Sequence, residues 1–408
     1  MPSFDLDLLR ARFPALSRRQ GTHPVAYFDG PGGTQVPAEV AEAMTRYLFD
    51  HNANTHWAYP SSAETDRILA EAKSALGAFL GCPPAEVAFG ANMTSLVFHF
   101  TRALRVDEGD VIVTTRLDHQ ANVAPWHRLA EERGARIREI PFDPETGRLD
   151  ASALEAAIDE RTRWIALGAA SNALGTITDV SAVRPRADAV GARVFVDAVH
   201  FAAHHRIDVA RMGADALACS PYKFYGPHLG TLWASSEILA DLDPPRLACA
   251  GDVGAEILET GTLSHEGIAG SAAAVEFIAS IGNPDAQAPL AERLDAAFDV
   301  LEARGAEVAL RMGEGLAAID GVEVYGPPAD GARTTTFGFT VRGRSSEEVT
   351  RELAEHRGVF TSHGDFYATT VIEDLGLAPD GLVRAGAACF TTDAEIDRLL
   401  EGVSALVR

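Results

Sequence analysis

Strand-like and helix-like patterns alternate through the first two thirds of the chain, and this alternation constrains the fold most. The runs "DVIVTT" (110–115), "RWIALGAAS" (163–171) and "RVFVDAVH" (193–200) are apolar and β-branched, and helical patterns lie between them. Consecutive parallel strands need such crossover helices. The sequence therefore predicts an α/β fold with an open, mostly parallel sheet and helices on both faces.

The pattern changes after about residue 285. A long helical stretch (288–319) leads to shorter strand patterns such as "TTTFGFTV" (334–341), which indicates a smaller α+β domain. The intervening "GNPDAQAP" (282–289) is typical of a loop or hinge. We predict a large α/β domain over 28–285, and a small domain that residues 1–27 form together with 286–408.

Charge and composition exclude several classes of function. A formal net charge of −23 disfavours nucleic acid and anionic membranes as partners. No apolar run reaches membrane-spanning length, and the N-terminal "MPSFDLDLLRARFPAL" lacks the apolar core of a signal peptide, so we expect a cytoplasmic protein. The four cysteines are far apart and show no ligand spacing, so we predict free thiols and no metal site.

Lysine is scarce, and one of the few lysines stands at a strand end. Of 35 Lys and Arg residues, only Lys73 and Lys223 are lysines, and Lys223 follows the strand pattern "DALACS" inside "ACSPYKFYGPHLG" (218–230). Partial desolvation there would lower its pKa and make it a nucleophile, although a surface lysine is the alternative.

A carboxylate ends the preceding strand pattern. Asp197 closes the apolar run of "RVFVDAVH", and His200 lies three residues further on. A buried carboxylate needs a cationic partner, whereas a helix cap or an exposed strand end is the alternative. A lysine that forms a Schiff base and an aspartate that pairs with a pyridinium nitrogen are what pyridoxal phosphate requires.

With these motifs on successive strand ends, the chain resembles the class V aminotransferases of the pyridoxal-phosphate fold-type I group. Within them it is similar to the cysteine desulfurase-like proteins. The resemblance runs from "YFDGPGGTQVP" (27–37) to "VRAGAACFTTDAEIDRL" (383–399). It implies a mostly parallel, seven-stranded sheet in the large domain, pyridoxal 5'-phosphate as cofactor, and a homodimer with its sites at the subunit interface.

The resemblance also implies roles around the cofactor ring. Lys223 would form the internal aldimine and move protons at the substrate Cα. Asp197 would pair with the ring nitrogen, and His200 would hydrogen-bond the phenolic oxygen. His119, in "LDHQANVAPW", would stack on the ring face. A helix-entry histidine with a satisfied hydrogen bond is the alternative for His119.

The phosphate would be held by residues from several segments. Ser220 and Tyr222 match the positions just before the lysine. The turn "FGANMTSL" (89–96) matches a glycine/threonine turn, but Asn92 replaces the glycine and Met93 the first threonine, while Thr94 is retained. Met93 and Thr94 would then contribute backbone amides at a helix N-terminus. Thr262, in "ETGTLSHEG", would reach the phosphate of the partner subunit.

Asn172 and Arg384 match the groups that clamp a substrate α-carboxylate, which implies an α-amino acid as substrate. Arginine suits this task because it can bind a carboxylate in bidentate fashion. A surface salt bridge is the alternative for Arg384, which the apolar surroundings disfavour.

The loop that should carry a sulfur-accepting thiol has no cysteine. It is "VFTSHGDFYATTVIEDLGL" (359–377), and Tyr367 stands near the position of the missing thiol. His363, Asp365 and Tyr367 are either proton donors and specificity contacts or parts of an ordinary capped turn. Cys249 is the one candidate thiol outside the loop.

The sequence thus predicts a pyridoxal-phosphate enzyme that acts on an α-amino acid, with C–S lyase or desulfurase-like chemistry. A class V aminotransferase or an epimerase acting on another amino acid is the first alternative. A non-catalytic, partner-binding relative is the second, and the intact set of Lys223, Asp197 and Arg384 argues against it.

Overall fold

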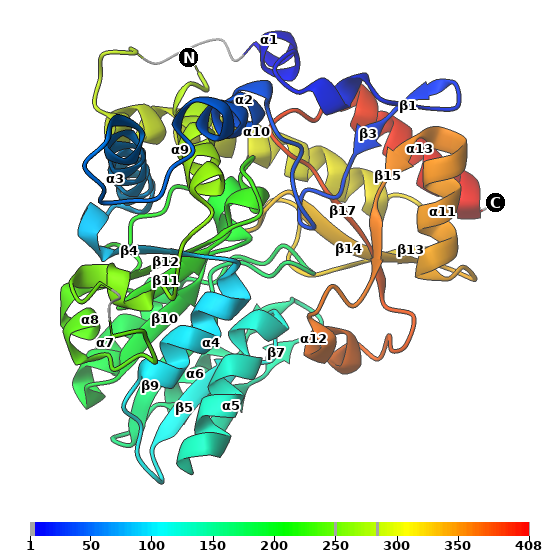
Figure 1. The fold of residues 1–408 in the computed structure, drawn as a ribbon. Coiled ribbons are helices and arrows are strands. Elements are labelled where there is room, and N and C mark those ends of the chain that lie inside the picture. The colour runs from blue at the N-terminus through cyan, green and yellow to red at the C-terminus, as the bar shows by residue number, and fades with distance from the viewer. Residues whose placement is uncertain (1–4, 249–250, 283–284, 408) are drawn as a thin grey trace.

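A seven-stranded sheet forms the centre of the larger part of the molecule (Figure 1). The structure is a computed structural model that describes residues 5–248, 251–282 and 285–407. Strand β12 is antiparallel to both of its neighbours, and the other strands run in one direction. This confirms the predicted α/β fold with a mostly parallel sheet. In spatial order the strands are β4 (Val87–Gly90), β12 (Gly230–Ala234), β11 (Ala216–Cys219), β10 (Arg193–Asp197), β9 (Thr162–Gly168), β5 (Val111–Thr115) and β6 (Arg136–Ile140).

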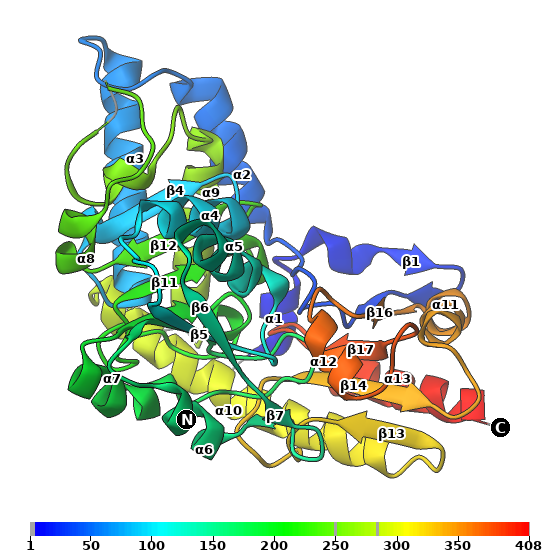
Figure 2. The same cartoon turned by 90° about the horizontal axis from the view of Figure 1, so that it is seen from below.

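Helices cover both faces of this sheet (Figure 2). Side chains alternate across a strand, so Ile165 and Leu167 of β9 join one apolar core, whereas Trp164 and Ala166 join the other. The first core also contains residues of α2 (Ala38–Arg46), α3 (Pro60–Leu80), α6 (Ala151–Ala157), α7 (Arg184–Val190) and α9 (His265–Ala279). The second contains residues of α4 (Met93–Ala103), α5 (Ala124–Arg133) and α8 (Ser236–Asp241).

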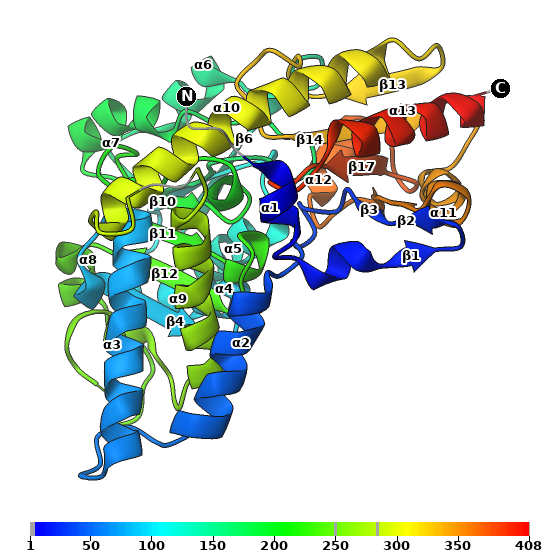
Figure 3. The same cartoon turned by 90° about the horizontal axis from the view of Figure 1, so that it is seen from above.

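A second sheet lies beside the first, built from the C-terminal part of the chain (Figure 3). Its strands are, in spatial order, β13 (Val322–Tyr325), β14 (Thr336–Val341), β17 (Leu382–Gly386) and β16 (Ser362–Gly364). Helices α11 (Ser346–Arg357) and α13 (Asp393–Val407) share its apolar core. Strand β3 (Ala26–Tyr27) pairs in parallel with β15 (Val359–Phe360), which joins the N-terminal segment to this region.

One long helix belongs to both regions. Helix α10 (Leu290–Ala317) places Leu294 and Phe298 in the core of the large sheet and Met312 and Leu316 in the core of the small one. The helix therefore fixes how the two sheets face each other (Figure 3). The predicted boundary segment 282–289 includes residues 283–284, which lie outside the described residues, and the proposed division at residue 285 stays a prediction.

Shorter elements complete the fold. Helix α1 (Leu6–Arg10) and the hairpin of β1 (Arg19–Gln20) and β2 (His23–Pro24) lie near the N-terminus, and β7 (Phe142–Asp143) pairs with β8 (Arg148–Leu149). Helix α2 continues directly into a π-helical turn, Tyr47–His51. Helix α12 (Thr369–Asp374) packs Val371 and Ile372 against Leu117 and Leu174. Nowhere in the described ranges does a helix combine the length and apolarity needed to cross a membrane.

We predict that the centre of β9 contributes strongly to stability. Leu167 is fully buried and lies opposite Val196 in the ladder. Leu167→Ala should lower the free energy of unfolding by about 2–5 kcal/mol, through lost apolar burial and the cavity left behind. Leu8→Ala is the matched control, since Leu8 is 69% exposed and should change little. Urea unfolding of the two variants measures the difference, and equal midpoints would contradict the burial argument.

Candidate functional site

The carboxyl ends of four neighbouring strands meet at one cavity. Residues that follow β5, β9, β10 and β11 line it together with the start of α4, as expected where parallel strands end at one edge of a sheet. Its lining residues include Met93, Thr94, Asp118, His119, Asn172, Asp197, His200, Ser220, Tyr222 and Lys223. Several of these also line an adjoining, more open cavity of about 780 Å³, which His363, Asp365, Tyr367 and Arg384 line from the other side.

Lys223 is half-buried in the wall that both cavities share. Burial, helped by the positive charge of Arg384, lowers the pKa of its ammonium group to about 7, while Asp29 and Asp197 oppose this shift. Its Nζ donates to the Pro31 carbonyl oxygen. A large fraction of the amine is therefore neutral near pH 7, and a neutral amine is the nucleophilic form.

Asp197 is a buried carboxylate at the end of β10, 8% exposed, which excludes the alternative of an exposed strand end. Its Oδ1 accepts a hydrogen bond from the Val199 amide at 2.9 Å. Burial raises the pKa of Asp197 to about 6, and the charge of Lys223 limits this rise. Within the described ranges no basic side chain forms a salt bridge with it, so the cavity offers this carboxylate to a cationic ligand atom.

Two neutral histidines face the same space. His119 Nδ1 accepts from the Ala121 amide at 2.9 Å, which places the ring proton on Nε2, and burial lowers its pKa to about 4. His200 is also buried, which lowers its pKa well below the usual value. His200 Nε2 lies 3.1 Å from the hydroxyl oxygens of Thr334 and Thr336. Both rings therefore present uncharged imidazoles to the cavity.

The N-terminus of α4 borders the cavity, with Met93 and Thr94 in its first turn. Asn92 caps this helix, because its Oδ1 accepts from the Ser95 amide at 2.8 Å. The helix also lies very close to β12: a Cβ on Gly230 would come within 2.3 Å of the Asn92 carbonyl carbon. This packing aims positive helix-end amides at the cavity, where an anion is favoured.

Thr262 lies apart from the other predicted residues. It lines a separate surface pocket with His99 and Ser264, and not the cavity that contains Lys223. A single chain therefore does not bring Thr262 to Lys223, and its predicted contact with a partner subunit's site stays a prediction.

Arg384 is buried in β17, 4% exposed, and its guanidinium faces Asp29. Nη2 donates to Asp29 Oδ1 at 3.1 Å, and Nη1 donates to the Asn172 carbonyl oxygen at 3.1 Å. The Phe366 ring covers its other side at 4.1 Å. Burial lowers the pKa of this guanidinium relative to a free arginine. The surface salt bridge considered above is therefore excluded by burial.

Asn172 joins the predicted loop to the cavity wall. Its Nδ2 donates to the Phe366 carbonyl oxygen at 2.9 Å, whereas its Oδ1 is buried and has no hydrogen-bond partner within the described residues. A buried acceptor without a partner is costly. A ligand donor in this cavity would satisfy it.

The loop that replaces the expected thiol is held over the larger cavity. The Tyr367 carbonyl oxygen accepts from the Gln120 amide at 2.8 Å, and the Tyr367 ring lies 5.6 Å from that of His119. Asp365 accepts from the Tyr367 amide and the Thr369 hydroxyl, both at 3.0 Å. Asp365 thus acts as the capping residue of a turn, while His363 and Tyr367 expose their side chains toward the cavity.

The described cysteines are poor nucleophiles. Burial raises the pKa of Cys82 and of Cys389 to about 12, and it raises the pKa of Cys219 further. The thiolate is the reactive form of cysteine, so these positions are chemically inert near neutral pH. Cys249, the remaining candidate, lies outside the described residues.

Sequence reasoning missed three residues of this site. Asp118 lines the first cavity, Asp29 pairs with Arg384, and Phe366 covers the Arg384 guanidinium. Asp118 directly precedes His119 and Asp29 stands in "FDGPGG", so both lie inside quoted motifs. No pattern along the chain distinguishes their burial, which depends on packing between distant segments.

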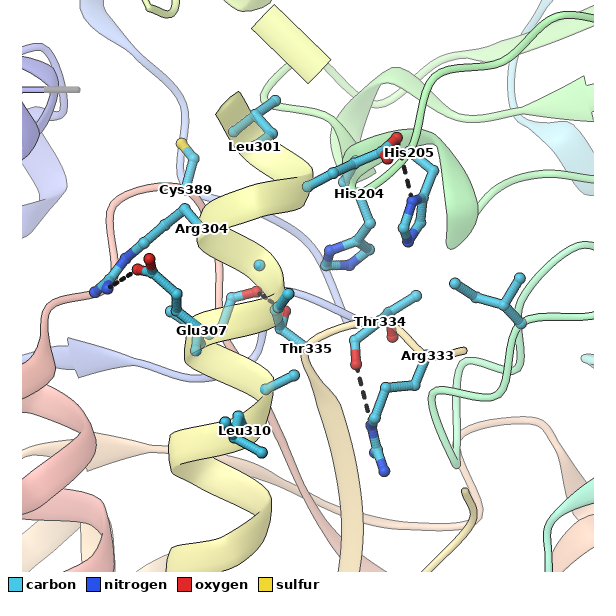
Figure 4. A pocket seen from close by; sticks show the side chains of 18 of the residues that line it. His204, His205, Leu301, Arg304, Glu307, Leu310, Arg333, Thr334, Thr335 and Cys389 are labelled. Atoms are coloured by element: carbon cyan, nitrogen blue, oxygen red, sulfur yellow. Dashed lines mark hydrogen bonds and ion pairs between the residues drawn. The ribbon is translucent and has the colours of Figure 1, made fainter. Parts of the chain in front are cut away.

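A further cavity, lined by His204, Arg333 and Thr334 among others, is shown in Figure 4. It has a volume of about 630 Å³ and lies between α10 and the segment that contains Thr334. The His204 ring centroid is 5.1 Å from that of His200, and burial lowers the pKa of His204 to about 3. Thr334 therefore connects this cavity with His200, but the cavity lacks the reactive amine.

The side chains around Lys223 fit pyridoxal phosphate. Among the described residues they provide a partly neutral amine, a buried carboxylate with no salt-bridge partner, and helix-end amides suited to a phosphate. The unpartnered Oδ1 of Asn172 adds an acceptor for a ligand donor. The amine suits the cofactor's aldehyde, the carboxylate suits its ring nitrogen, and the helix-end amides suit its phosphate.

Comparisons with known proteins agree with this fit. The family described as Aminotransferase class-V matches residues 26–399. The chain is 32% identical to Probable cysteine desulfurase 2 of Mycobacterium leprae, over 98% of this chain and 96% of that protein. It is 30% identical to Aminotransferase-like protein FGM3 of Gibberella zeae, over 98% and 97%. The apo structure of cysteine desulfurase from Thermococcus onnurineus NA1 has a TM-score of 0.87 at 26% identity, over 100% and 99%.

We predict that the cofactor-free protein is modified selectively at Lys223. An amine-reactive acylating reagent should modify Lys223 with a half-maximal rate near pH 7, because its pKa is lowered to about 7. The only other lysine, Lys73, lies 3.3 Å from Glu259 and serves as internal reference in each digest. Peptide mass spectrometry over a pH series measures both. A Lys223 midpoint near the ordinary value of 10.5 would contradict the desolvation argument.

Proposed function

We propose that this protein, which belongs to the aminotransferase class-V family, cleaves the C–S bond of an α-amino acid. It is a pyridoxal-phosphate-dependent enzyme similar to cysteine desulfurases. The observation that carries the proposal is the convergence of Lys223, Asp197 and Arg384 on adjoining cavities. The family supplies the cofactor, and this geometry supports the choice of substrate class.

Bound pyridoxal phosphate supplies an electron sink that stabilises negative charge at the substrate Cα. Lys223 is the covalent anchor, and its amine takes and returns the Cα proton, for which a pKa of about 7 is well matched. Asp197 would hold the positive charge of the ring nitrogen. His119, a neutral imidazole, would contact the ring face, and His200 would serve the phenolic oxygen. Met93, Thr94, Ser220 and Tyr222 would hold the phosphate.

Arg384 binds the substrate carboxylate. Arg384 pairs with the Asp29 carboxylate, so its guanidinium is already oriented to receive a carboxylate group. The substrate carboxylate binds at this guanidinium. Phe366 over the guanidinium and Asn172 below it hold the planar group in one orientation. His363 and Tyr367, at the opposite wall, contact the substrate side chain.

The sulfur leaves without forming a persulfide on the loop. Residues 359–377 contain no cysteine, and the described cysteines have strongly raised pKa values. Loss of the Cα proton followed by loss of the Cβ substituent releases cysteine sulfur as sulfide. Hydrolysis of the remaining three-carbon unit with one water then gives pyruvate and ammonia, so the atoms balance. Transamination or epimerisation of another amino acid is the alternative, because the same residues bind and deprotonate Cα.

The protein also forms a homodimer in this proposal, with Thr262 reaching the partner's phosphate. Large apolar side chains that lie close in sequence support such an interface, since Phe49 is 81% exposed and Trp57 is 61% exposed. The acidic chain, with no membrane-spanning helix in its described part, is proposed to act in the cytoplasm.

The cofactor assignment to Lys223 is tested by absorbance. The purified wild-type protein with added pyridoxal phosphate should show the visible band of a lysine-bound cofactor, and Lys223→Ala should lose it, because an alanine cannot bind the aldehyde. Lys73→Ala is the matched control and should keep the band. A band that persists in Lys223→Ala would place the covalent bond elsewhere.

The reaction is tested with L-cysteine as substrate. We expect sulfide and pyruvate in equal amounts, and Arg384→Lys should raise KM at least about tenfold, because a lysine cannot make the bidentate contact. Alanine in place of pyruvate would indicate a desulfurase that uses an external sulfur acceptor. Conversion of the cofactor to its amine form by another amino acid, without sulfide, would favour a transaminase.

A further inference from the structure

Asp118 is a second buried carboxylate at the cofactor cavity, and the chemistry above does not use it. It is 5% exposed and lines the same cavity as Asp197 and Lys223. The Gly168 amide donates to its Oδ1 at 3.0 Å and to its Oδ2 at 3.1 Å, and Asn122 Nδ2 donates to Oδ2 at 3.0 Å. Each of these contacts is a donor, so they all favour the ionised carboxylate.

The backbone of Gly168 connects Asp118 to Asp197. Gly168 lies opposite Asp197 in the parallel ladder of β9 and β10, and its amide is the donor to Asp118. A Cβ at residue 168 would come within 2.5 Å of Asp118 Oδ1, so any other residue would displace the carboxylate. The strand end therefore accommodates the carboxyl group of Asp118 only because residue 168 is a glycine.

The ionised form of the buried Asp118 carboxylate is unfavourable when no cation lies beside it. Burial raises the pKa of Asp118 to about 7, and repulsion from Asp197 adds to the rise. The other titratable groups that line the cavity are His119, His200, Tyr222 and Lys223. Both histidines are neutral at pH 7 and Lys223 is only partly protonated, so these groups supply little positive charge to the two carboxylates. Two neighbouring carboxylates thus face one cavity.

We propose that Asp118 is a positioning residue that acts through Asp197, and that its negative charge keeps the cofactor's ring nitrogen protonated. A like charge beside Asp197 raises the affinity of that carboxylate for a positive partner, as it would for a proton. The inference rests on the proposed role of Asp197 at the ring nitrogen. The bound ring cation in turn removes the repulsion between the two carboxylates.

This arrangement should measurably lower the stability of the cofactor-free protein. The pKa of Asp118 is raised to about 7 in the folded state from an ordinary value of 3.8. The unfolded chain therefore loses its proton at lower pH, so the stability of the folded state falls as pH rises from about 4 to about 7. Asp118→Asn removes this fall while it preserves the shape of the side chain.

The experiment compares wild type, Asp118→Asn and Asp118→Glu, each with and without pyridoxal phosphate. In Asp118→Asn we expect the visible cofactor band to titrate at a pH about one unit lower, and pyridoxal phosphate to bind about tenfold more weakly. Asp118→Glu keeps the charge and should stay closer to the wild type in both measurements. Without cofactor, Asp118→Asn should melt at a higher temperature than the wild type at pH 8, and the difference should disappear at pH 4.

Three results would overturn the inference and leave the proposed function in place. The first is an Asp118→Asn protein with unchanged affinity and an unchanged titration of the band. The second is an Asp118→Glu protein that shifts as far as Asp118→Asn, which would make shape, and not charge, decisive. The third is an Asp118→Asn protein that is less stable than the wild type at pH 8, which would assign the carboxylate to the fold. A wild-type protein without the band would overturn the proposed function and this role together.

Discussion

The common direction of β5, β9, β10 and β11 is the constraint on which the rest of the site depends. Parallel strands end at one edge, and each chain segment that leaves this edge brings a polar residue to the same cavity. Apolar cores pack on both faces of the sheet, and Asp118, Asp197 and His200 at its edge are buried. Groups that would be ordinary on a surface therefore acquire shifted proton affinities, and a lysine, two carboxylates and two histidines act as one electrostatic unit.

The two adjoining cavities divide the residues of the candidate site into two groups. Lys223, Asp197 and the N-terminus of α4 line the first cavity, whereas His363 in β16 and Phe366 and Tyr367 in the following loop line the second. In the proposed function, chemistry at Cα depends on the first group, and the choice of leaving group depends on the second. A change in the loop would then redirect the outcome without disturbing the residues proposed to hold the cofactor.

The sequence predicted the α/β fold and placed a few residues of the cavity, because these residues stand at the ends of strands with a clear apolar pattern. Lys223 and Asp197 are of this kind. The resemblance to a known family supplied most of the others. Asp118 and Asp29 were missed because their importance arises from burial between segments far apart in the chain, which no local pattern records. For Asp365 the sequence left two interpretations open, a chemical role and a capped turn, and its carboxylate accepts local hydrogen bonds of the kind that cap a turn.

Helix α10 has a mechanical consequence for the site. Since Leu294 and Phe298 at one end belong to one core and Met312 and Leu316 at the other end belong to the second, the two sheets cannot slide past each other as separate bodies. Any rotation of the sheet that contains Arg384, relative to the strand end that precedes Lys223, must bend this helix. The helix therefore limits how far the Arg384 side and the Lys223 side of the site can move apart.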